Sequence, residues 1–169
     1  MRISQAAVGT ATLLALAALL ASFAPLRAVS AAHGTPSAGY TIHIDAQKHF
    51  THHNTEWAHH WCKAVANGML ECLIFPSDDN NAPMVATEII VQPKMYKSFS
   101  PSERALWHYH KTEIPKVNAK MPDVSAAAAK KMVAQITDTY GKIYVLYDPM
   151  DTKLPIGKPV INVLEGNQK

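Results

Sequence analysis

The chain has 169 residues, of which 48% are hydrophobic and 17% are charged, and its formal net charge at pH 7 is +3. This length favours a single domain, and the apolar content excludes an intrinsically disordered or collagen-like protein. Two of the basic residues, Arg2 and Arg27, lie in an N-terminal leader, and no lysine-rich run follows it. The charge pattern therefore excludes a typical nucleic-acid-binding protein.

Residues 1–32 have the pattern of a secretory signal peptide that is cleaved near His33. Arg2 forms a short positive region, residues 11–20 (ATLLALAALL) are strongly apolar, and small residues close the segment. The strongly apolar stretch is about half of the roughly 20 residues that span a bilayer, which favours cleavage over a retained membrane anchor. We therefore predict an exported protein, periplasmic or secreted, with no transmembrane segment after cleavage.

After cleavage, residues 33–39 are predicted to be a flexible N-terminus and residues 40–169 to form one domain. Export would place Cys62 and Cys72 in an oxidising environment, where they are candidates for a disulfide. Their spacing permits this bond without requiring it, since bridging depends on the separation of the two Cα atoms. Two small, buried, reduced side chains are the alternative that the sequence leaves open.

In the N-terminal half, residues 40–44 alternate weakly between apolar and polar side chains and predict a short strand. A helix is predicted over residues 54–68, because Asn54 or Thr55 can cap it and apolar residues recur at helical spacing at Trp57, Trp61, Ala64, Val65 and Gly68. Residues 71–75 (ECLIF) and 84–91 (MVATEIIV) predict two strands, and the turn-forming residues between them predict a β-hairpin.

In the C-terminal half, Ser100-Pro101-Ser102-Glu103 is a capping box that predicts a short helix. Ser125 is predicted to cap a longer helix that continues to Tyr140, and Gly141 is predicted to be its left-handed stop. These signals depend on local backbone chemistry, because a cap residue must satisfy N–H groups that have no partner inside the helix.

Two further strands are predicted near the C-terminus, over residues 142–147 (KIYVLY) and, as an edge strand, over residues 160–164. Helices and strands alternate along the chain without a regular βαβ repeat, and the clearest strand pair is antiparallel. We therefore predict an α+β fold, in which a small antiparallel or mixed sheet packs against about three helices in a single compact domain.

Several short stretches occur in a recognisable order along the chain: His49-Phe50, residues 59–62 (HHWC), residues 71–75, Glu88 within MVATEIIV, residues 106–110 (LWHYH) with Glu113, residues 139–142 (TYGK) and residues 154–157 (LPIG). In these stretches the chain resembles the domain of unknown function that plant oil-body-associated proteins share with bacterial relatives. The resemblance extends over residues 42–163 and implies a family but no established reaction. Plant members lack a secretory leader, so an oil-body location does not carry over, and Val145 stands where their pattern has a histidine.

Histidine is unusually frequent, with nine residues, all of them in the first two thirds of the chain. On the predicted helix, His60 borders the apolar stripe, whereas His59 points in almost the opposite direction. We expect residues 106–110 to be extended, which places His108 and His110 on one strand face. Two imidazoles in this arrangement can bind one metal ion together.

Glu88 is the second unusual residue, because it lies in the middle of a predicted strand, where a carboxylate is costly to bury unless it is paired. Together these side chains predict a metal site with His60, His108 and His110 as ligands, completed or oriented by His49, His59, Glu88 or Glu113. Imidazole and carboxylate ligands suit Zn²⁺, Cu²⁺ or Ni²⁺ better than Mg²⁺ or Ca²⁺, so the expected cofactor is one transition metal ion, zinc or copper. The spacing matches no standard zinc motif, and ordinary hydrogen bonding of the same side chains is the alternative.

Three functional hypotheses follow from the sequence. The first is an exported, non-enzymatic protein that binds a transition metal or a small ligand through the histidine cluster. The second is an envelope metal-dependent enzyme of the hydrolase or oxidase class, which would keep an open coordination position. The third is a structural or interaction module without a metal. No nucleophile elbow, phosphate-binding loop or dinucleotide fingerprint is present, so the sequence assigns no catalytic residue.

Overall fold

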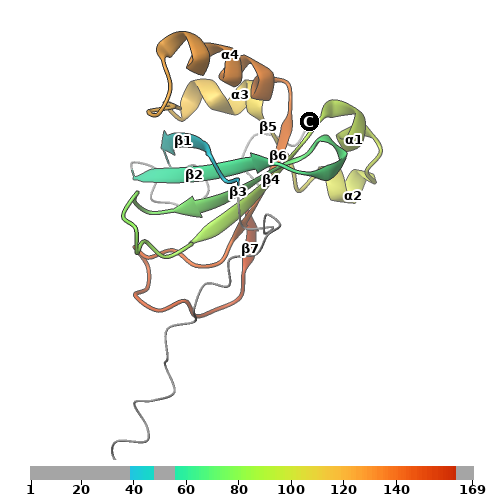
Figure 1. Ribbon diagram of the computed structural model, residues 1–169. Coiled ribbons are helices and arrows are strands. Elements are labelled where there is room, and N and C mark those ends of the chain that lie inside the picture. Colours follow the sequence, from blue (N-terminus) through green and yellow to red (C-terminus); the bar gives the residue numbers. More distant parts are fainter. Residues whose placement is uncertain (1–38, 48–55, 163–169) are drawn as a thin grey trace, which may run out of the picture. The chain divides into compact units, whose positions relative to one another are not determined.

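The computed structural model describes residues 39–47 and 56–162, all within one compact unit, Pro36–Lys169 (Figure 1). The predicted signal peptide and residues 33–38 of the predicted flexible segment lie outside the described residues. Among the helices that are described, none has the length and hydropathy that a bilayer crossing requires.

The described strands form one sheet in which every pairing is antiparallel: β1 (Ile42–Gln47), β2 (Trp57–Ala64), β3 (Leu70–Phe75), β4 (Ala86–Val91), β5 (His108–Tyr109), β6 (Tyr140–Val145) and β7 (Val160–Asn162). Their spatial order is β1-β2-β3-β4-β6-β5, and β7 also pairs with β6. The first four strands follow the chain, whereas β6 lies between β4 and β5. This crossover brings Glu88 of β4 opposite Ile143, and His108 of β5 opposite Gly141.

The described helices are short except for the last: α1 (Pro93–Lys97), α2 (Pro101–Arg104), α3 (His110–Glu113) and α4 (Ala126–Thr137), with 3-10 turns η2 (Ala66–Gly68) and η3 (Ile114–Lys116). In Figure 1, α3 and α4 lie together above one side of the sheet, and α1 and α2 lie near one end of it. The predicted α+β class is confirmed. The sheet is larger than the small sheet predicted, with seven strands in the described residues.

Two predicted helix starts are confirmed by their caps. The Ser100 hydroxyl accepts a hydrogen bond from the backbone N–H of Glu103 at 3.2 Å, and α2 begins at Pro101. The Ser125 hydroxyl accepts from the N–H of Ala128 at 3.4 Å, and α4 begins at Ala126. These starts were predictable because a cap is a contact between residues only three apart in the chain.

The helix predicted over residues 54–68 is wrong, because residues 57–64 form strand β2. From Trp57 to Lys63, every second side chain of β2 is buried and those between are partly exposed, which is the alternation of a strand. The prediction failed because a four-residue spacing such as Trp57 to Trp61 places two side chains on one face of a helix and of a strand alike. Pairing with β1 on one side and β3 on the other decides for the strand.

Two further local predictions are also wrong. Gly141 is not a helix stop: α4 ends at Thr137, and Gly141 lies inside β6, paired with β4 and β5. The extended segment predicted over residues 106–110 is limited to His108–Tyr109, because α3 begins at His110. At Gly141, pairing with β4 and β5 overrides the local helix-stop signal.

Strand alternation gives the sheet two faces with different surroundings. The inner face lies under α3 and α4 and carries Ile44, His60, Cys62, Cys72, Glu88 and Ile90, which line cavities together with residues of those helices and η3. The outer face carries the intervening side chains, including His43, Asp45, His59 and Trp61.

Cys62 and Cys72 form a disulfide on the inner face. They lie directly opposite each other in the register of β2 and β3, with Cα atoms 4.0 Å apart. The sequence left the bond open because it did not give this distance, and the antiparallel pairing supplies it.

Candidate metal centre

Glu88, His108 and His110 form a cluster at the inner face, called the inner cluster below. Glu88 projects from the middle of β4, His108 from β5, and His110 from the first residue of α3. All three are buried, with exposed fractions of 5%, 1% and 6%. One ligand atom from each lies within 4.8 Å of those of the other two.

The polar atoms of the inner cluster converge on His108 Nε2. This nitrogen lies 3.1 Å from Glu88 Oε1 and 3.3 Å from His110 Nε2. His110 Nε2 and Glu88 Oε1 are themselves 3.2 Å apart, so the three atoms form a triangle. Glu113, also buried, approaches His108 Nε2 with Oε2 at 2.9 Å.

These separations match the spacing of ligand atoms around a metal ion. Ligand atoms about 2.0–2.1 Å from a tetrahedral Zn²⁺ lie about 3.3 Å from one another. The three sides of the inner cluster measure 3.1, 3.2 and 3.3 Å. A cation of this size therefore fits the triangle with little movement of the side chains.

The orientation of His110 is fixed by Thr139. The Thr139 hydroxyl donates to the carbonyl of Ile136 at 2.6 Å, so its oxygen accepts the bond from His110 Nδ1 at 2.8 Å. Because Nδ1 then carries the ring proton, Nε2 presents its lone pair to the cluster, which is the tautomer that a metal ligand requires.

This tautomer leaves a single proton for several acceptors. The proton on His108 Nε2 faces His110 Nε2, Glu88 Oε1 and Glu113 Oε2, and it can be donated well to only one of them. A metal ion, in contrast, accepts electron pairs from several ligands at once. These converging atoms therefore suit a bound metal ion better than a single hydrogen bond.

The two carboxylates concentrate negative charge on this point. Burial by itself would raise the pKa of Glu88, but the hydrogen bond from His108 and the charge of that imidazole hold it well below its usual value. Burial by itself would lower the pKa of His108, but hydrogen bonds to Glu113 and Glu88 and the charge of those carboxylates raise it to about 10. The site therefore favours a positive charge at its centre. In the metal-free protein, the proton on His108 supplies this charge.

Gly141 makes room for the cluster. A Cβ atom on this residue would overlap Glu88 Oε1 and His108 Nε2. Since β6 runs between β4 and β5, the backbone of Gly141 forms the floor between the strands that carry the two side chains. The physical reason for glycine here is this close approach, and its backbone has no left-handed conformation.

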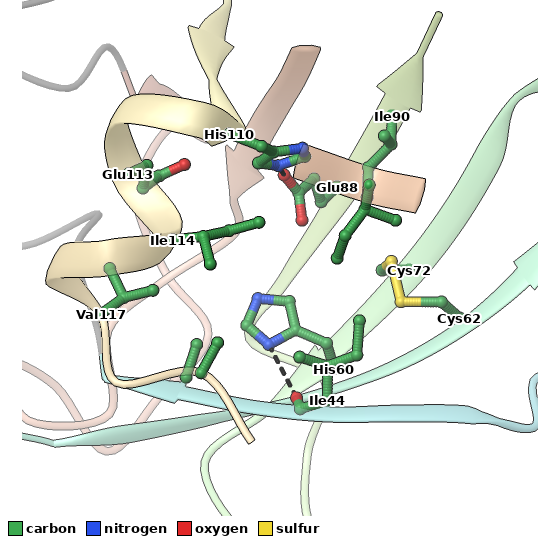
Figure 2. Close-up of a pocket in the computed structure, with 13 residues that line it drawn as sticks. Ile44, His60, Cys62, Cys72, Glu88, Ile90, His110, Glu113, Ile114 and Val117 are labelled. Atoms are coloured by element: carbon green, nitrogen blue, oxygen red, sulfur yellow. Dashed lines mark hydrogen bonds and ion pairs between the residues drawn. A yellow bond between two sulfur atoms is a disulfide. The ribbon is translucent and has the colours of Figure 1, made fainter. Parts of the chain in front are cut away.

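A small cavity of about 50 Å³ adjoins the cluster (Figure 2). Glu88, His110 and Glu113 line it on one side, and His60 lines it from β2 on the other. Most of the remaining lining is aliphatic, with Ile44, Ile90, Ile114 and Val117 among it. The cavity has room for a few water molecules, so a metal ion in the cluster would face a small, largely apolar space.

The sequence named His60, His108 and His110 as ligands, and the structure brings the last two together with Glu88. His60 is buried at 4% exposure and faces the same cavity, with its Nδ1 donating to the carbonyl oxygens of Ile44 and Ala58 at 3.2 and 3.1 Å. Glu88 and Glu113, named as supporting residues, lie at the cluster itself.

Two supporting candidates lie elsewhere. His59 projects from the outer face, away from the cluster, because it precedes His60 in a strand. His49 lies outside the described residues. Sequence reasoning also missed Thr139 and Gly141, although both belong to the stretch TYGK that carries the family resemblance. Only the pairing of β6 with β4 and β5 reveals what these two residues do.

Comparison with known proteins places the chain in a family. The family model described as "Protein of unknown function (DUF1264)" matches residues 35–167. The chain belongs to the DUF1264 family. The matched range contains the whole inner cluster together with Glu113, Thr139 and Gly141.

Relatives of this DUF1264 chain include plant proteins. Oil body-associated protein 1B of Arabidopsis thaliana is 35% identical over 103 residues, which cover 60% of this chain and 43% of that protein. Oil body-associated protein 2C of Arabidopsis thaliana is 29% identical over 102 residues, covering 60% and 43%. Oil body-associated protein 2B of Zea mays is 28% identical over 116 residues, covering 68% and 46%. The chain thus spans less than half the length of these curated relatives. No solved structure matches it.

Proposed function

We propose that this protein binds one transition metal ion through Glu88, His108 and His110. The observation that carries the proposal is the convergence of two imidazole nitrogens and a carboxylate oxygen at 3.1–3.3 Å, all buried, where one proton faces several acceptors. A divalent cation would neutralise Glu88 and Glu113 and would satisfy every atom of the triangle at once.

The donor set favours a particular class of metal. Two imidazole nitrogens and a carboxylate suit Zn²⁺ and Cu²⁺ and disfavour Mg²⁺ and Ca²⁺, which prefer shells composed of oxygen atoms. The hydrogen bond that His110 donates to Thr139 is the kind of outer contact that holds the ring of a metal-ligating histidine. Zinc is the simplest probe, because it has no redox chemistry and no geometric preference of its own.

A second candidate function is a metal-dependent enzyme, and the cavity beside the cluster favours it. Three protein ligands leave a coordination position open, whereas a structural zinc site is closed by four. The small cavity shares Ile44, Ile90 and Ile136 with a larger one of about 450 Å³, lined mainly by aliphatic and methionine side chains between the sheet and α4. A small, largely apolar molecule with one metal-binding polar group fits this combination.

The test is the metal content of the full-length protein, purified without a histidine tag and dialysed extensively. We expect one tightly held Zn²⁺ or Cu²⁺ per chain that depends on these ligands. The double variant His108→Gln with His110→Gln should hold one ion per chain fewer than the wild type, whereas Asp79→Asn, an exposed residue after β3, should hold as much as the wild type. If the double variant retains this metal while remaining folded by circular dichroism, the proposed site is wrong.

We also propose that the protein acts outside the cytoplasm. The predicted leader over residues 1–32 and the disulfide between Cys62 and Cys72 support this location, since such bonds persist in oxidising compartments. Fractionation of cells that express the full-length chain should find it outside the cytoplasm and shortened by the length of the leader. A full-length product in the cytoplasm would refute the proposal.

A further inference from the structure

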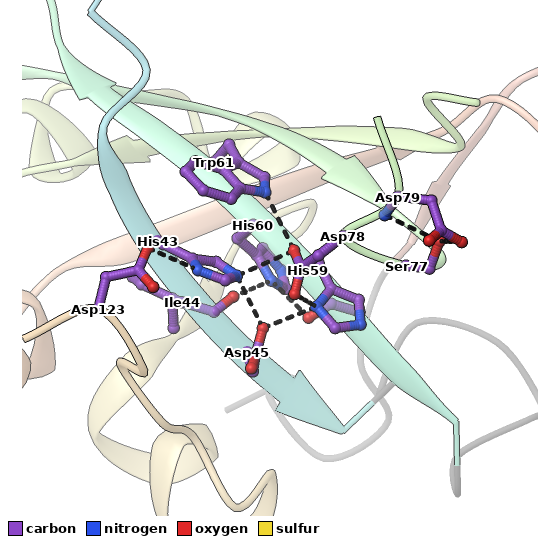
Figure 3. Close-up of polar contacts among 11 residues, drawn as sticks. His43, Ile44, Asp45, His59, His60, Trp61, Ser77, Asp78, Asp79 and Asp123 are labelled. Carbon is purple, nitrogen blue, oxygen red and sulfur yellow. Dashed lines mark hydrogen bonds and ion pairs between the residues drawn. The ribbon is translucent and has the colours of Figure 1, made fainter. Parts of the chain in front are cut away.

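A second group of histidines and carboxylates lies on the outer face, at the edge of the sheet formed by β1. His43 and Asp45 are two residues apart on β1 and so share a face, and His59 on β2 is the direct partner of Asp45. Asp78 reaches the same point from the turn after β3 (Figure 3). These four residues, called the outer cluster below, have ligand atoms that all lie within 4.8 Å of one another.

Each imidazole of the outer cluster touches both carboxylates. His43 Nε2 lies 3.0 Å from Asp45 Oδ1 and 3.1 Å from Asp78 Oδ1. His59 Nδ1 lies 2.8 Å from Asp45 Oδ1 and 2.9 Å from Asp78 Oδ2. The arrangement is a closed ring of two nitrogens and two carboxylates around one point.

The atoms are close but are not aimed at one another as hydrogen bonds would require. Within the described part of the chain, His43 Nε2, Asp45 Oδ1 and His59 Nδ1 are all inaccessible to solvent, and none makes a hydrogen bond of acceptable geometry. Buried polar atoms without such bonds are costly, and native proteins avoid them. Ligand atoms that point to a common centre instead of to each other are the expected geometry of a coordination shell.

Outer contacts orient the ligands. Asp123 Oδ2 lies 3.0 Å from His43 Nδ1, so the Nδ1–H donates to this carboxylate and Nε2 is left to face the cluster. Trp61 Nε1 donates to Asp78 Oδ1 at 3.3 Å, and the Trp61 ring stacks on His43 with centroids 4.2 Å apart. A carboxylate that holds a histidine ring from behind is a recurring feature of metal sites.

We infer that the outer cluster is a second metal site, which takes a divalent first-row transition ion such as Zn²⁺ through His43, Asp45, His59 and Asp78. Two carboxylates and two neutral imidazoles balance the charge of such an ion. Contacts of 2.8–3.1 Å between ligand atoms match bonds of about 2.0–2.2 Å to a central ion.

The site differs from the inner cluster in its access to solvent. The Asp78 side chain is 41% exposed, whereas that of His43 is 4% exposed. An ion can therefore enter from the Asp78 side and be held against His43. Because Asp78 lies in a turn and His43 and Asp45 lie on the edge strand, a bound ion would fasten that turn to the edge of the sheet.

The experiment is a calorimetric titration of the full-length, untagged, metal-free protein with Zn²⁺. Asp78→Asn and His59→Gln each remove one ligand at a partly exposed position, which spares the fold. The matched control is Asp79→Asn, which removes the neighbouring charge from the same turn but no ligand. We expect the first two variants to lose about tenfold or more in affinity at one site, and the control to titrate like the wild type.

A second measurement separates this inference from the proposed function. The inner-cluster double variant, His108→Gln with His110→Gln, should keep the outer site and lose only the inner one. Should that variant fail to fold, the same comparison of Asp78→Asn with Asp79→Asn in the wild-type chain still decides. If Asp78→Asn and His59→Gln both titrate like Asp79→Asn, the outer cluster is a set of ion pairs and the inference is overturned.

Discussion

The two faces of one sheet carry clusters composed of the same residue types, histidine and acidic side chains, in opposite surroundings. The inner cluster is buried under α3, and its three side chains have exposed fractions between 1% and 6%. The outer cluster lies at a sheet edge and opens to solvent through Asp78. Histidine and acidic side chains can thus be part of the core, as in the inner cluster, or lie at an edge that the core supports, as in the outer cluster.

The energetic consequences differ in the same way. A charge buried in the core must be compensated, and removing its partner leaves it uncompensated at a large cost. A charge at the surface is screened by water, and losing its partner costs little. The inner cluster should therefore govern stability as well as metal binding, whereas the outer cluster should govern metal binding almost alone.

The largest expected difference is between Glu88→Gln and Asp78→Asn in the metal-free protein. Glu88→Gln removes a buried carboxylate from His108 and should lower the free energy of unfolding by about 3 kcal/mol. Asp78→Asn should lower it by at most about 1 kcal/mol. Urea denaturation followed by circular dichroism measures both, and equal losses would contradict the contrast between the two faces.

The disulfide lies on the inner face, so its removal should affect the two faces differently. Its two cysteines are separated by 10 residues, and a loop of this length implies a stabilisation of about 2–3 kcal/mol in the chain-entropy model. The variant Cys62→Ala with Cys72→Ala should unfold at correspondingly lower urea concentration. Its Zn²⁺ affinity at the outer cluster should not change, and a loss there would show that the two faces are coupled.

Gly141→Ala tests the close packing of the inner cluster. The added Cβ must displace Glu88 and His108, so we expect destabilisation by about 1–3 kcal/mol and loss of metal from the inner cluster. The outer cluster serves as the internal control and should bind Zn²⁺ as before. Full metal content in this variant would contradict the close packing of Glu88 and His108 against the backbone of Gly141.

The pH dependence of the metal-free protein tests the charge pairing inside the inner cluster. His108 has a pKa of about 10 in the folded protein, raised above the unfolded value of 6.5. Its pairing with the carboxylates therefore contributes stability that is fully present below pH 6.5 and is lost as the pH rises through about 10. Unfolding midpoints between pH 6 and 10.5 should fall more steeply for the wild type than for His108→Gln, and parallel curves would contradict this assignment.

The reliable sequence predictions were those in which cause and effect lie close together in the chain. The caps at Ser100 and Ser125 and the hairpin of β3 and β4 depend on neighbouring residues, and all three are present in the structure. The composition and order of elements also gave the α+β class. The segment around His59 and His60 failed because its spacing fits a helix and a strand equally.

For the candidate site, too, the sequence indicated the residues but not how they come together. Histidines two residues apart, such as His108 and His110, and an acidic residue inside a strand, such as Glu88, are visible in the sequence and indicate unusual chemistry. Their meeting depends on β6 entering the sheet between β4 and β5. The outer cluster was invisible because the predicted helix hid the alternation that places His59 beside Asp45.

The residue types that can bind a metal, the family and the starts of two helices could be predicted from the sequence, since they depend on residue identity and short-range contacts. Which ligands meet, and on which face of the sheet, depends on the fold. A strand places neighbouring side chains on opposite faces, and the order of the strands brings distant side chains together. His59 and His60, adjacent in the chain, thus lie on opposite faces: His59 belongs to the outer cluster, and His60 lines the cavity beside the inner cluster.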